Sequence, residues 1–128
     1  RDRTGAALSV GDVLPALKGK MNGSAIRVPT ANVSVSDFGF TAERDTGTEE
    51  INTLLTDASN GALNGVLSVN TLPLVSIDFN HDSHSSIADL TQTHVMNKQL
   101  VRVLAWYDNE WGFSCRMLDN TVKIGKTL

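Results

Sequence analysis

The side chain whose type and position best suit ligand binding is that of Asn109. Residues 101–107 alternate and are rich in β-branched and aromatic types, which is typical of a buried strand. From Asp108, a favoured N-cap residue, the apolar spacing becomes helical. A strand running straight into a helix exposes polar side chains at the end of a sheet. The Asn109 carboxamide both donates and accepts hydrogen bonds, so it suits a carboxamide ligand; the alternative is that it only caps the helix.

Two further positions suit anions. Arg27 lies in a short apolar stretch, residues 24–28, and alternation along a predicted strand places it opposite two buried neighbours. Its planar guanidinium matches a phosphate group better than a lysine would, and a structural salt bridge is the alternative. Thr4 and Gly5 precede a predicted helix, where a hydroxyl and a backbone N–H can bind an anion or form an ordinary cap.

The polar segment around residues 80–86 contains residue types that bind metals. His81 and His84 are three positions apart, with Asp78 and Asp82 nearby. In a turn this spacing is equally explained by side chains that hydrogen-bond their own backbone, so we expect no metal site.

Periodicity predicts the elements that position these residues. Helices are expected near residues 7–14, 46–60 and 108–123, with Pro15 ending the first. For the second helix we expect a capping box of Thr46 and Glu49 at its start and Gly61 at its end. Strands are expected near residues 24–28, 33–40, 63–69, 74–79, 87–95 and 100–107.

The order of these elements indicates the fold class. Strands and helices do not alternate strictly, which predicts an α+β fold whose largely antiparallel or mixed sheet has helices on one face. The last two strands are joined by a short polar connection and should form an antiparallel hairpin. Within residues 33–40 the apolar phase changes near Ser36 and Asp37, which indicates a bulge or a strand packed on both faces.

Composition limits the function classes. The 128 residues are 41% hydrophobic, as in an ordinary globular domain or part of one. The net charge of −3 is spread without blocks, so we expect neither nucleic-acid nor membrane binding. No apolar run approaches the roughly 20 residues that span a bilayer, and no apolar signal segment is present, so we expect a cytoplasmic location. Because the first residue is Arg and not Met, we expect a fragment or a processed chain.

Three blocks of sequence resemble the C-terminal part of glyceraldehyde-3-phosphate dehydrogenase. They are residues 26–34 (IRVPTANVS), 78–80 (DFN) and 107–112 (YDNEWG), in the order the family has them. The resemblance implies an oxidoreductase of glycolysis that uses NAD, with NADP not excluded. It also implies a phosphorylated aldehyde substrate, inorganic phosphate as second substrate, and a homo-oligomer, which is a tetramer in the family.

The same resemblance implies roles for five residues. Arg27 matches the residue that holds the substrate phosphate. Thr4 and Gly5 match the loop that binds inorganic phosphate. Asn109 matches the residue that hydrogen-bonds the nicotinamide carboxamide, and Phe113 stands where many members have a Tyr beside the nicotinamide.

The chain lacks part of the chemistry that such an enzyme needs. The family's nucleophile lies in a Ser-Cys-Thr-Thr-Asn-Cys motif and its base is a His, and both precede the segment matched here. Cys115 falls on the apolar face of the last predicted helix, where a buried thiol is inert packing. We therefore assign no catalytic residue and expect no activity from this chain alone.

The resemblance also suggests how the chain is divided and which alternatives to weigh. Residues 1–107 would form a partial catalytic domain, and residues 108–128 a helix and tail packed on a missing nucleotide-binding domain. Erythrose-4-phosphate dehydrogenase is a close alternative, suggested by residues 72–76, 80–82 and 111–113. A non-catalytic interaction module of the same fold is the third possibility.

Overall fold

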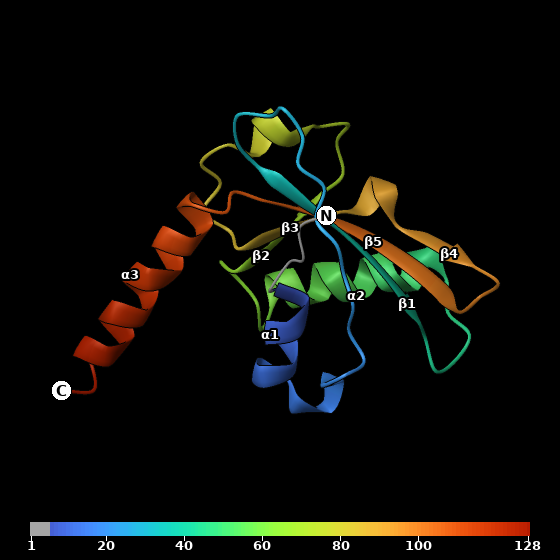
Figure 1. The fold of residues 1–128 in the computed structure, drawn as a ribbon, viewed down its shortest axis with the longest axis horizontal. Helices are drawn as coiled ribbons and strands as arrows, with labels where there is room; N and C mark the ends of the chain where they lie inside the picture. The colour runs from blue at the N-terminus through green and yellow to red at the C-terminus, as the bar shows by residue number, and fades with distance from the viewer. Residues whose placement is uncertain (1–5) are drawn as a thin grey trace. The chain divides into compact units, whose positions relative to one another are not determined.

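Strand β5 (Leu100–Tyr107) is the centre of the only sheet in residues 6–128, the part of the chain that this computed structural model describes (Figure 1). It pairs antiparallel with β1 (Ser34–Thr41), β3 (Ser86–Asp89) and β4 (His94–Met96). Strand β2 (Leu67–Asn70) is parallel to β3, which gives the order β1-β5-β3-β2. The sheet is therefore mixed and the fold is α+β, as the sequence predicts.

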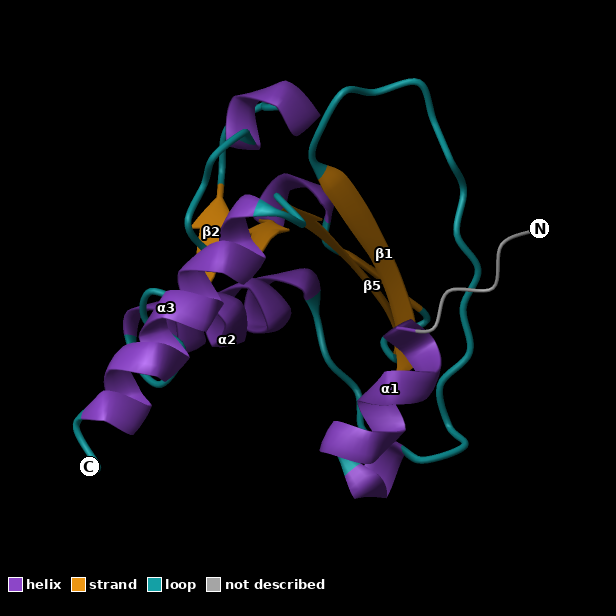
Figure 2. Cartoon of the chain, turned by 60° about the vertical axis from the view of Figure 1, so that its left-hand side comes forward, coloured by secondary structure: helices purple, strands orange, loops and turns teal. Residues whose placement is uncertain are grey.

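The chain divides into two compact units, residues 1–30 and 31–128. The first contains α1 (Ala6–Val13) and the 3-10 helix η1 (Pro15–Leu17). Pro15 ends α1 as expected, because proline disfavours a helical conformation in the residue before it. The second unit holds the sheet, the helices α2 (Thr48–Asn60) and α3 (Trp111–Gly125), and the 3-10 helices η2 (Ser76–Phe79) and η3 (Leu90–Gln92). Helix α2 contacts β2 and lies beside the strands (Figure 2).

The phase change in β1 is not a bulge. Eight consecutive residue pairs join β1 to β5 without interruption, so the bulge, one of the two alternatives that the sequence leaves open, is wrong. The apolar residues lie on both faces of the strand. Val35 pairs with Trp106 on one face, while Phe38 and Phe40 lie on the other with ring centroids 5.4 Å apart.

The buried core lies against the face of the sheet that holds Trp106. Val33, Phe79 and Ile87 form a buried cluster, and Trp106 packs against it with its ring 5.7 Å from that of Phe79. The indole N–H of Trp106 donates to Oδ2 of the buried Asp89 at 3.1 Å. This hydrogen bond satisfies both polar groups where β3 and β5 meet.

The strand expected at residues 24–28 does not form. None of the five strands in the described part of the chain includes this segment, and Ile26 and Val28 are 86% and 64% exposed. The backbone instead turns after it, with the Thr30 N–H donating to the Val28 carbonyl at 2.8 Å. Arg27 therefore does not alternate with buried neighbours.

Side-chain hydrogen bonds to the backbone replace two other expected strand segments. The Asp78 carboxylate accepts the N–H of Val75 at 2.8 Å, which favours the turn of η2 over an extended strand at residues 74–79. The Asp89 carboxylate accepts the N–H of Thr91 at 3.1 Å, so η3 divides residues 87–95 into β3 and β4. The antiparallel hairpin of β4 and β5 is confirmed.

Helix α2 and strand β2 both start later in the chain than the sequence predicts. Gly47 is the N-cap of α2 and gives no side-chain cap, while the Thr46 hydroxyl donates to Glu50 at 2.7 Å, so the expected capping box is wrong. Gly61 ends the helix as expected. The turns that follow occupy residues 61–66, and β2 therefore begins only at Leu67.

In the part of the chain that is described, no helix combines the length and apolar character needed to pass through a bilayer.

Candidate functional site

Asp108 is a buried carboxylate, 2% exposed, at the junction of β5 and α3. Its Oδ1 atom accepts the backbone N–H of Glu110 at 3.1 Å and of Trp111 at 2.9 Å. Its Oδ2 atom accepts the side-chain amide of Asn32 and the backbone N–H of His81, both at 2.9 Å. One side chain thus joins the start of α3 to the segment before β1 and to the loop after η2. We call residues 108–113 the Asp108 corner.

These hydrogen bonds determine the charge of Asp108. Burial by itself raises the pKa of this carboxyl, but the hydrogen bonds from the backbone and from Asn32 outweigh it and hold the pKa below its ordinary value. All four partners are donors, and only an ionised carboxylate offers accepting positions to all of them. Asp108 is therefore negatively charged at neutral pH.

The three sequence blocks meet around this carboxylate. Asn32 belongs to the first block, and its side chain joins the other two. Its amide donates to Asp108 and also to Oδ1 of Asn80 at 2.7 Å. Phe79 enters the core against Trp106. Residues far apart in the sequence therefore form one connected polar and aromatic cluster beside the start of α3.

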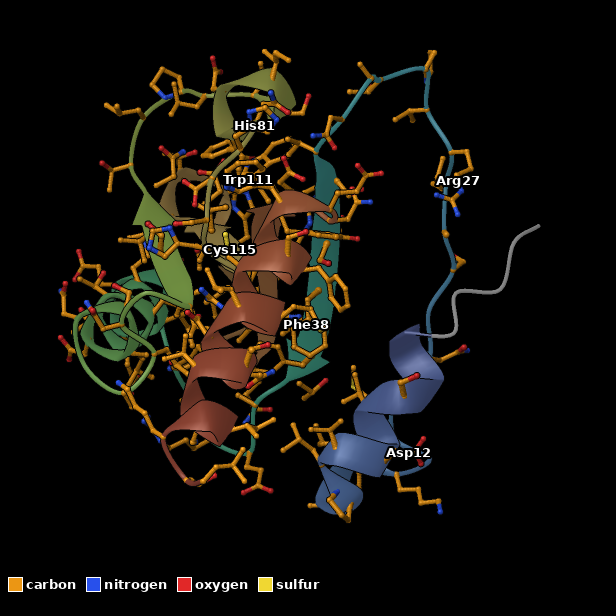
Figure 3. The ribbon with its side chains drawn as sticks, turned by 90° about the vertical axis from the view of Figure 1, so that its left-hand side faces the viewer. Asp12, Arg27, Phe38, His81, Trp111 and Cys115 are labelled. Atoms are coloured by element: carbon orange, nitrogen blue, oxygen red, sulfur yellow. The ribbon has the colours of Figure 1, made fainter. Side chains whose placement is uncertain are left out.

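The first turn of α3 is also held by close packing. The ring centroids of His81 and Trp111 lie 4.7 Å apart. Figure 3 labels both residues near the start of α3. Gly112 is buried, and a Cβ atom there would lie 2.9 Å from the carbonyl oxygen of His84. One turn further, the Arg116 guanidinium donates to the Gly65 carbonyl at 2.8 Å. Packing and hydrogen bonds together fix the position of this turn.

Asn109 and Phe113 are exposed on this fixed turn. The helix cap hydrogen bonds come from Asp108, and within residues 6–128 the Asn109 carboxamide has no hydrogen bond of its own. The alternative that Asn109 only caps the helix is therefore wrong. Phe113 is 66% exposed. The corner thus presents a donor, an acceptor and a flat apolar ring to solvent, which suits a planar ligand with a carboxamide group.

The anion-binding candidates lie in the other part of the chain. Arg27 is exposed and belongs to the unit formed by residues 1–30. Thr4 and Gly5 lie outside the described residues. The structure therefore describes the surroundings of Asn109, Phe113 and Arg27. It does not describe the predicted anion-binding loop at Thr4 and Gly5.

The histidine segment and the cysteine have local contacts. Nδ1 of His84 lies 2.7 Å from Oδ1 of Asp82, and the same oxygen accepts the backbone N–H of His84 at 2.8 Å. Among the described residues there is no group of three or more His, Cys, Asp or Glu side chains that could hold a metal ion. Cys115 is half-buried on α3 and not fully buried as expected, because the outer side of this helix is exposed.

The residues that organise the corner were only partly visible in the sequence. The sequence predicts that Asp108 caps the helix, and its side chain does accept the N–H groups of the first turn, but no local pattern indicates its contacts with Asn32 and His81. The available signal was that Asn32, Asn80 and Asp108 each lie within one of the three blocks. Contact between blocks nearly 80 residues apart depends on the pairing of β1 with β5, which the local pattern does not specify.

The family model described as glyceraldehyde 3-phosphate dehydrogenase, C-terminal domain, matches residues 2–109. The chain therefore belongs to the glyceraldehyde-3-phosphate dehydrogenase family, as a C-terminal domain. It is 57% identical over 125 residues to the glyceraldehyde-3-phosphate dehydrogenase of Cereibacter sphaeroides, covering 98% of this chain and 38% of that protein. It is also 57% identical over 123 residues to the enzyme of that name from Xanthobacter flavus, covering 96% of this chain and 37% of that protein. The chain thus spans little more than a third of the length of these relatives.

Proposed function

We propose that this chain is the C-terminal, catalytic-domain part of an NAD-dependent phosphorylating dehydrogenase of glyceraldehyde 3-phosphate, an enzyme of glycolysis in the cytoplasm. Membership of the family supports this proposal. The observation that carries it is the exposed Asn109 carboxamide at the fixed Asp108 corner. NADP remains the alternative cofactor, because the residues that select the ribose belong to a nucleotide-binding fold outside these 128 residues.

In this proposal the residues of the chain bind and orient substrates. Asn109 hydrogen-bonds the nicotinamide carboxamide, and Phe113 lies beside the nicotinamide. Arg27 binds the phosphate of the aldehyde, and Thr4 and Gly5 bind inorganic phosphate. Bound NAD supplies the hydride acceptor.

The catalytic thiol and the general base would come from outside these 128 residues. The Ser-Cys-Thr-Thr-Asn-Cys motif does not occur in the chain. Cys115 does not replace it, because it lies outside any such motif and is half-buried on α3. We therefore expect no dehydrogenase activity from residues 1–128 alone, and cysteine-dependent NADH formation by this chain would refute the proposal.

We further propose that α3 packs on the nucleotide-binding domain and that the complete enzyme is a homotetramer. Exposed apolar side chains along α3 support the first part. They are Trp111, Phe113, Met117, Leu118, Val122 and Ile124. The coding sequence upstream of the Arg1 codon tests whether this chain is part of a longer enzyme, and we expect an open frame that encodes the catalytic motif. A stop followed by a local start would favour the interaction module.

The activity is tested in a chimera in which residues 1–128 replace the matching part of the Cereibacter sphaeroides enzyme. We expect NADH formation from glyceraldehyde 3-phosphate, NAD and phosphate. Asn109→Ala should weaken NAD binding, and Arg27→Ala should raise the KM for the aldehyde about tenfold, since a charge-assisted phosphate contact is lost. Arg44→Ala, which removes an exposed guanidinium paired with Glu50, is the matched control and should leave the KM unchanged.

The same chimera distinguishes the two dehydrogenase activities. Glyceraldehyde 3-phosphate and erythrose 4-phosphate are compared by kcat/KM under identical conditions. A higher kcat/KM for erythrose 4-phosphate would replace the proposed substrate with the alternative one. An Arg27→Ala variant with normal KM for both aldehydes would remove Arg27 from the substrate site.

A further inference from the structure

We propose that Asp108 is a positioning residue for the nicotinamide contact of Asn109, acting through hydrogen bonds on both sides of its carboxylate. This inference rests on the proposed function of Asn109. It assigns to Asn32 and to the loop at His81 a role in cofactor binding although neither is proposed to touch the cofactor.

The first side of the carboxylate fixes the backbone of Asn109. Oδ1 of Asp108 bonds the N–H of Glu110, so residue 109 lies inside a small ring closed by a side chain and the backbone. The bond to the Trp111 N–H continues this restraint into α3. The polypeptide on both sides of Asn109 is therefore held.

The second side joins that ring to the rest of the unit. A helix cap needs only Oδ1, yet Oδ2 accepts two more hydrogen bonds, from Asn32 and His81. Val33 and His81 have φ angles of 67° and 62°, which are unfavourable for residues with side chains and most of all for a β-branched one. The surrounding contacts must compensate for these conformations. The bonds at Oδ2 hold the corner to the segment before β1 and to the loop after η2.

The chemistry of the four partners explains why this residue is Asp and not Asn. Each partner donates a hydrogen, and an asparagine at this position would accept with one oxygen only and turn its amide toward two donors. Asp108→Asn therefore keeps the shape but loses the bonds on one side. Asn32→Ala removes a single bond at Oδ2 and leaves the helix cap unchanged.

The decisive test compares two nucleotides in the chimeric dehydrogenase. NAD contains the nicotinamide and ADP-ribose lacks it. A mispositioned Asn109 therefore weakens the binding of NAD and leaves that of ADP-ribose unchanged. We expect Asp108→Asn to raise the Kd for NAD about tenfold and Asn32→Ala about threefold, with Kd for ADP-ribose within about twofold of the parent value. Asp57→Asn, an exposed residue on α2, is the matched control and should change neither Kd.

A second readout uses this 128-residue chain and needs no cofactor. Hydrogen exchange of the Glu110 and Trp111 amides should accelerate in Asn32→Ala, although both amides keep their acceptor. A carboxylate that serves only as a helix cap predicts no change in this variant. The double variant Asn32→Asp with Asp108→Asn restores a hydrogen bond of reversed direction and should recover part of the lost protection.

The outcomes separate the inference from the function on which it rests. If Asn109→Ala weakens NAD and ADP-ribose equally, the proposed role of Asn109 is wrong. If Asn109→Ala weakens NAD selectively while Asp108→Asn and Asn32→Ala do not, only the positioning role is wrong. If Asp108→Asn does not fold, Asn32→Ala decides the question by its NAD affinity and its amide exchange.

Discussion

At the scale of single residues, Asp108 links folding to proton binding. Its pKa in the folded protein lies below the value of about 3.9 expected in the unfolded chain. The ionised form is therefore favoured by folding. This contribution to stability is fully present above about pH 3.9 and is lost as the pH falls through the lower, folded pKa.

We expect Asp108→Asn to reduce both the stability and its dependence on acid. At pH 7 the variant should lose about 1–3 kcal/mol of unfolding free energy, because buried donors lose their acceptor. Below pH 4 its stability should fall less steeply than that of the parent. Urea unfolding followed by tryptophan fluorescence between pH 2 and 7 measures both effects.

Part of the acid dependence should remain in that variant. The pKa of Asp37 is lowered chiefly by its hydrogen bonds with Arg102, and that of Glu50 chiefly by its hydrogen bond with Arg44. These pairs are unaffected by the change at position 108. Identical acid profiles for parent and variant would show that Asp108 does not titrate as its hydrogen bonds require.

Gly112 and Gly125 make a matched pair for testing the close approach of α3 to the loop at His84. Gly112→Ala places a Cβ 2.9 Å from a backbone oxygen, and we expect a loss of about 1–3 kcal/mol despite the better helix propensity of alanine. Gly125→Ala meets nothing within 4 Å and should be neutral or stabilising. Chemical unfolding of both variants gives the comparison, and equal stabilities would contradict the close contact.

At the scale of elements, the turn between β4 and β5 has an unfavourable residue. Asn97 and Lys98 have φ angles of 49° and 62°, as in the two-residue turns that favour glycine at the second position. We expect Lys98→Gly to stabilise the protein by about 0.5–1 kcal/mol. Lys98→Ala, which keeps a Cβ, should give no such gain, because the exposed contact of Lys98 with Asp45 at 3.5 Å contributes little.

The thermal midpoint of the two Lys98 variants distinguishes backbone strain from charge. If glycine and alanine raise the midpoint equally, removal of the lysine charge and not relief of the positive φ is responsible. A lower midpoint for glycine would show that the turn has another conformation.

Elements with strong periodicity were predictable from the sequence, and elements set by local side-chain bonds were not. The apolar spacing of α2 and the alternation of β5 identified both correctly. Apolar alternation at residues 74–79 suggested a strand, yet the Asp78 carboxylate bonds the nearby backbone and a turn of 3-10 helix forms instead. The apolar pattern of a sequence shows which side chains can be buried, but it does not show which polar groups form hydrogen bonds with one another.

In the candidate site, too, features set by the local sequence were predictable and features set by tertiary contacts were not. Asn109 followed from the change of period between β5 and α3, since both elements are adjacent in sequence. Asn32 did not follow, because its bond with Asp108 depends on tertiary pairing. Arg27 was expected in a strand with buried neighbours, and without a sheet partner its apolar neighbours are exposed.

At the scale of the whole molecule, the division into two compact units predicts independent folding of the larger one. We expect residues 31–128, produced without residues 1–30, to keep the sheet and α3. Amide resonances of β1 and β5 in two-dimensional NMR spectra should match those of the 128-residue chain. Residues 31–99, which lack β5, provide the matched control and should be unfolded.

Poorly dispersed amide resonances for residues 31–128 would show that residues 1–30 are required for folding. A dispersed spectrum for residues 31–99 would show that β5 is dispensable. The first result would contradict the independence of the larger unit, and the second would contradict the arrangement in which β5 pairs with three other strands.

The position of β5 after all of its partner strands in the sequence has a consequence for biosynthesis. Of the pairings in the sheet, only that of β2 with β3 is independent of β5. While the ribosome is still translating the earlier strands, β1 and β4 have no partner, and their edges and apolar faces are open to other nascent chains. The sheet can close only after Tyr107 has emerged from the exit tunnel, and the Asp108 corner forms in the same step. A ribosome that pauses just before the codon for Leu100 would therefore prolong the time during which β1 and β4 have no pairing partner.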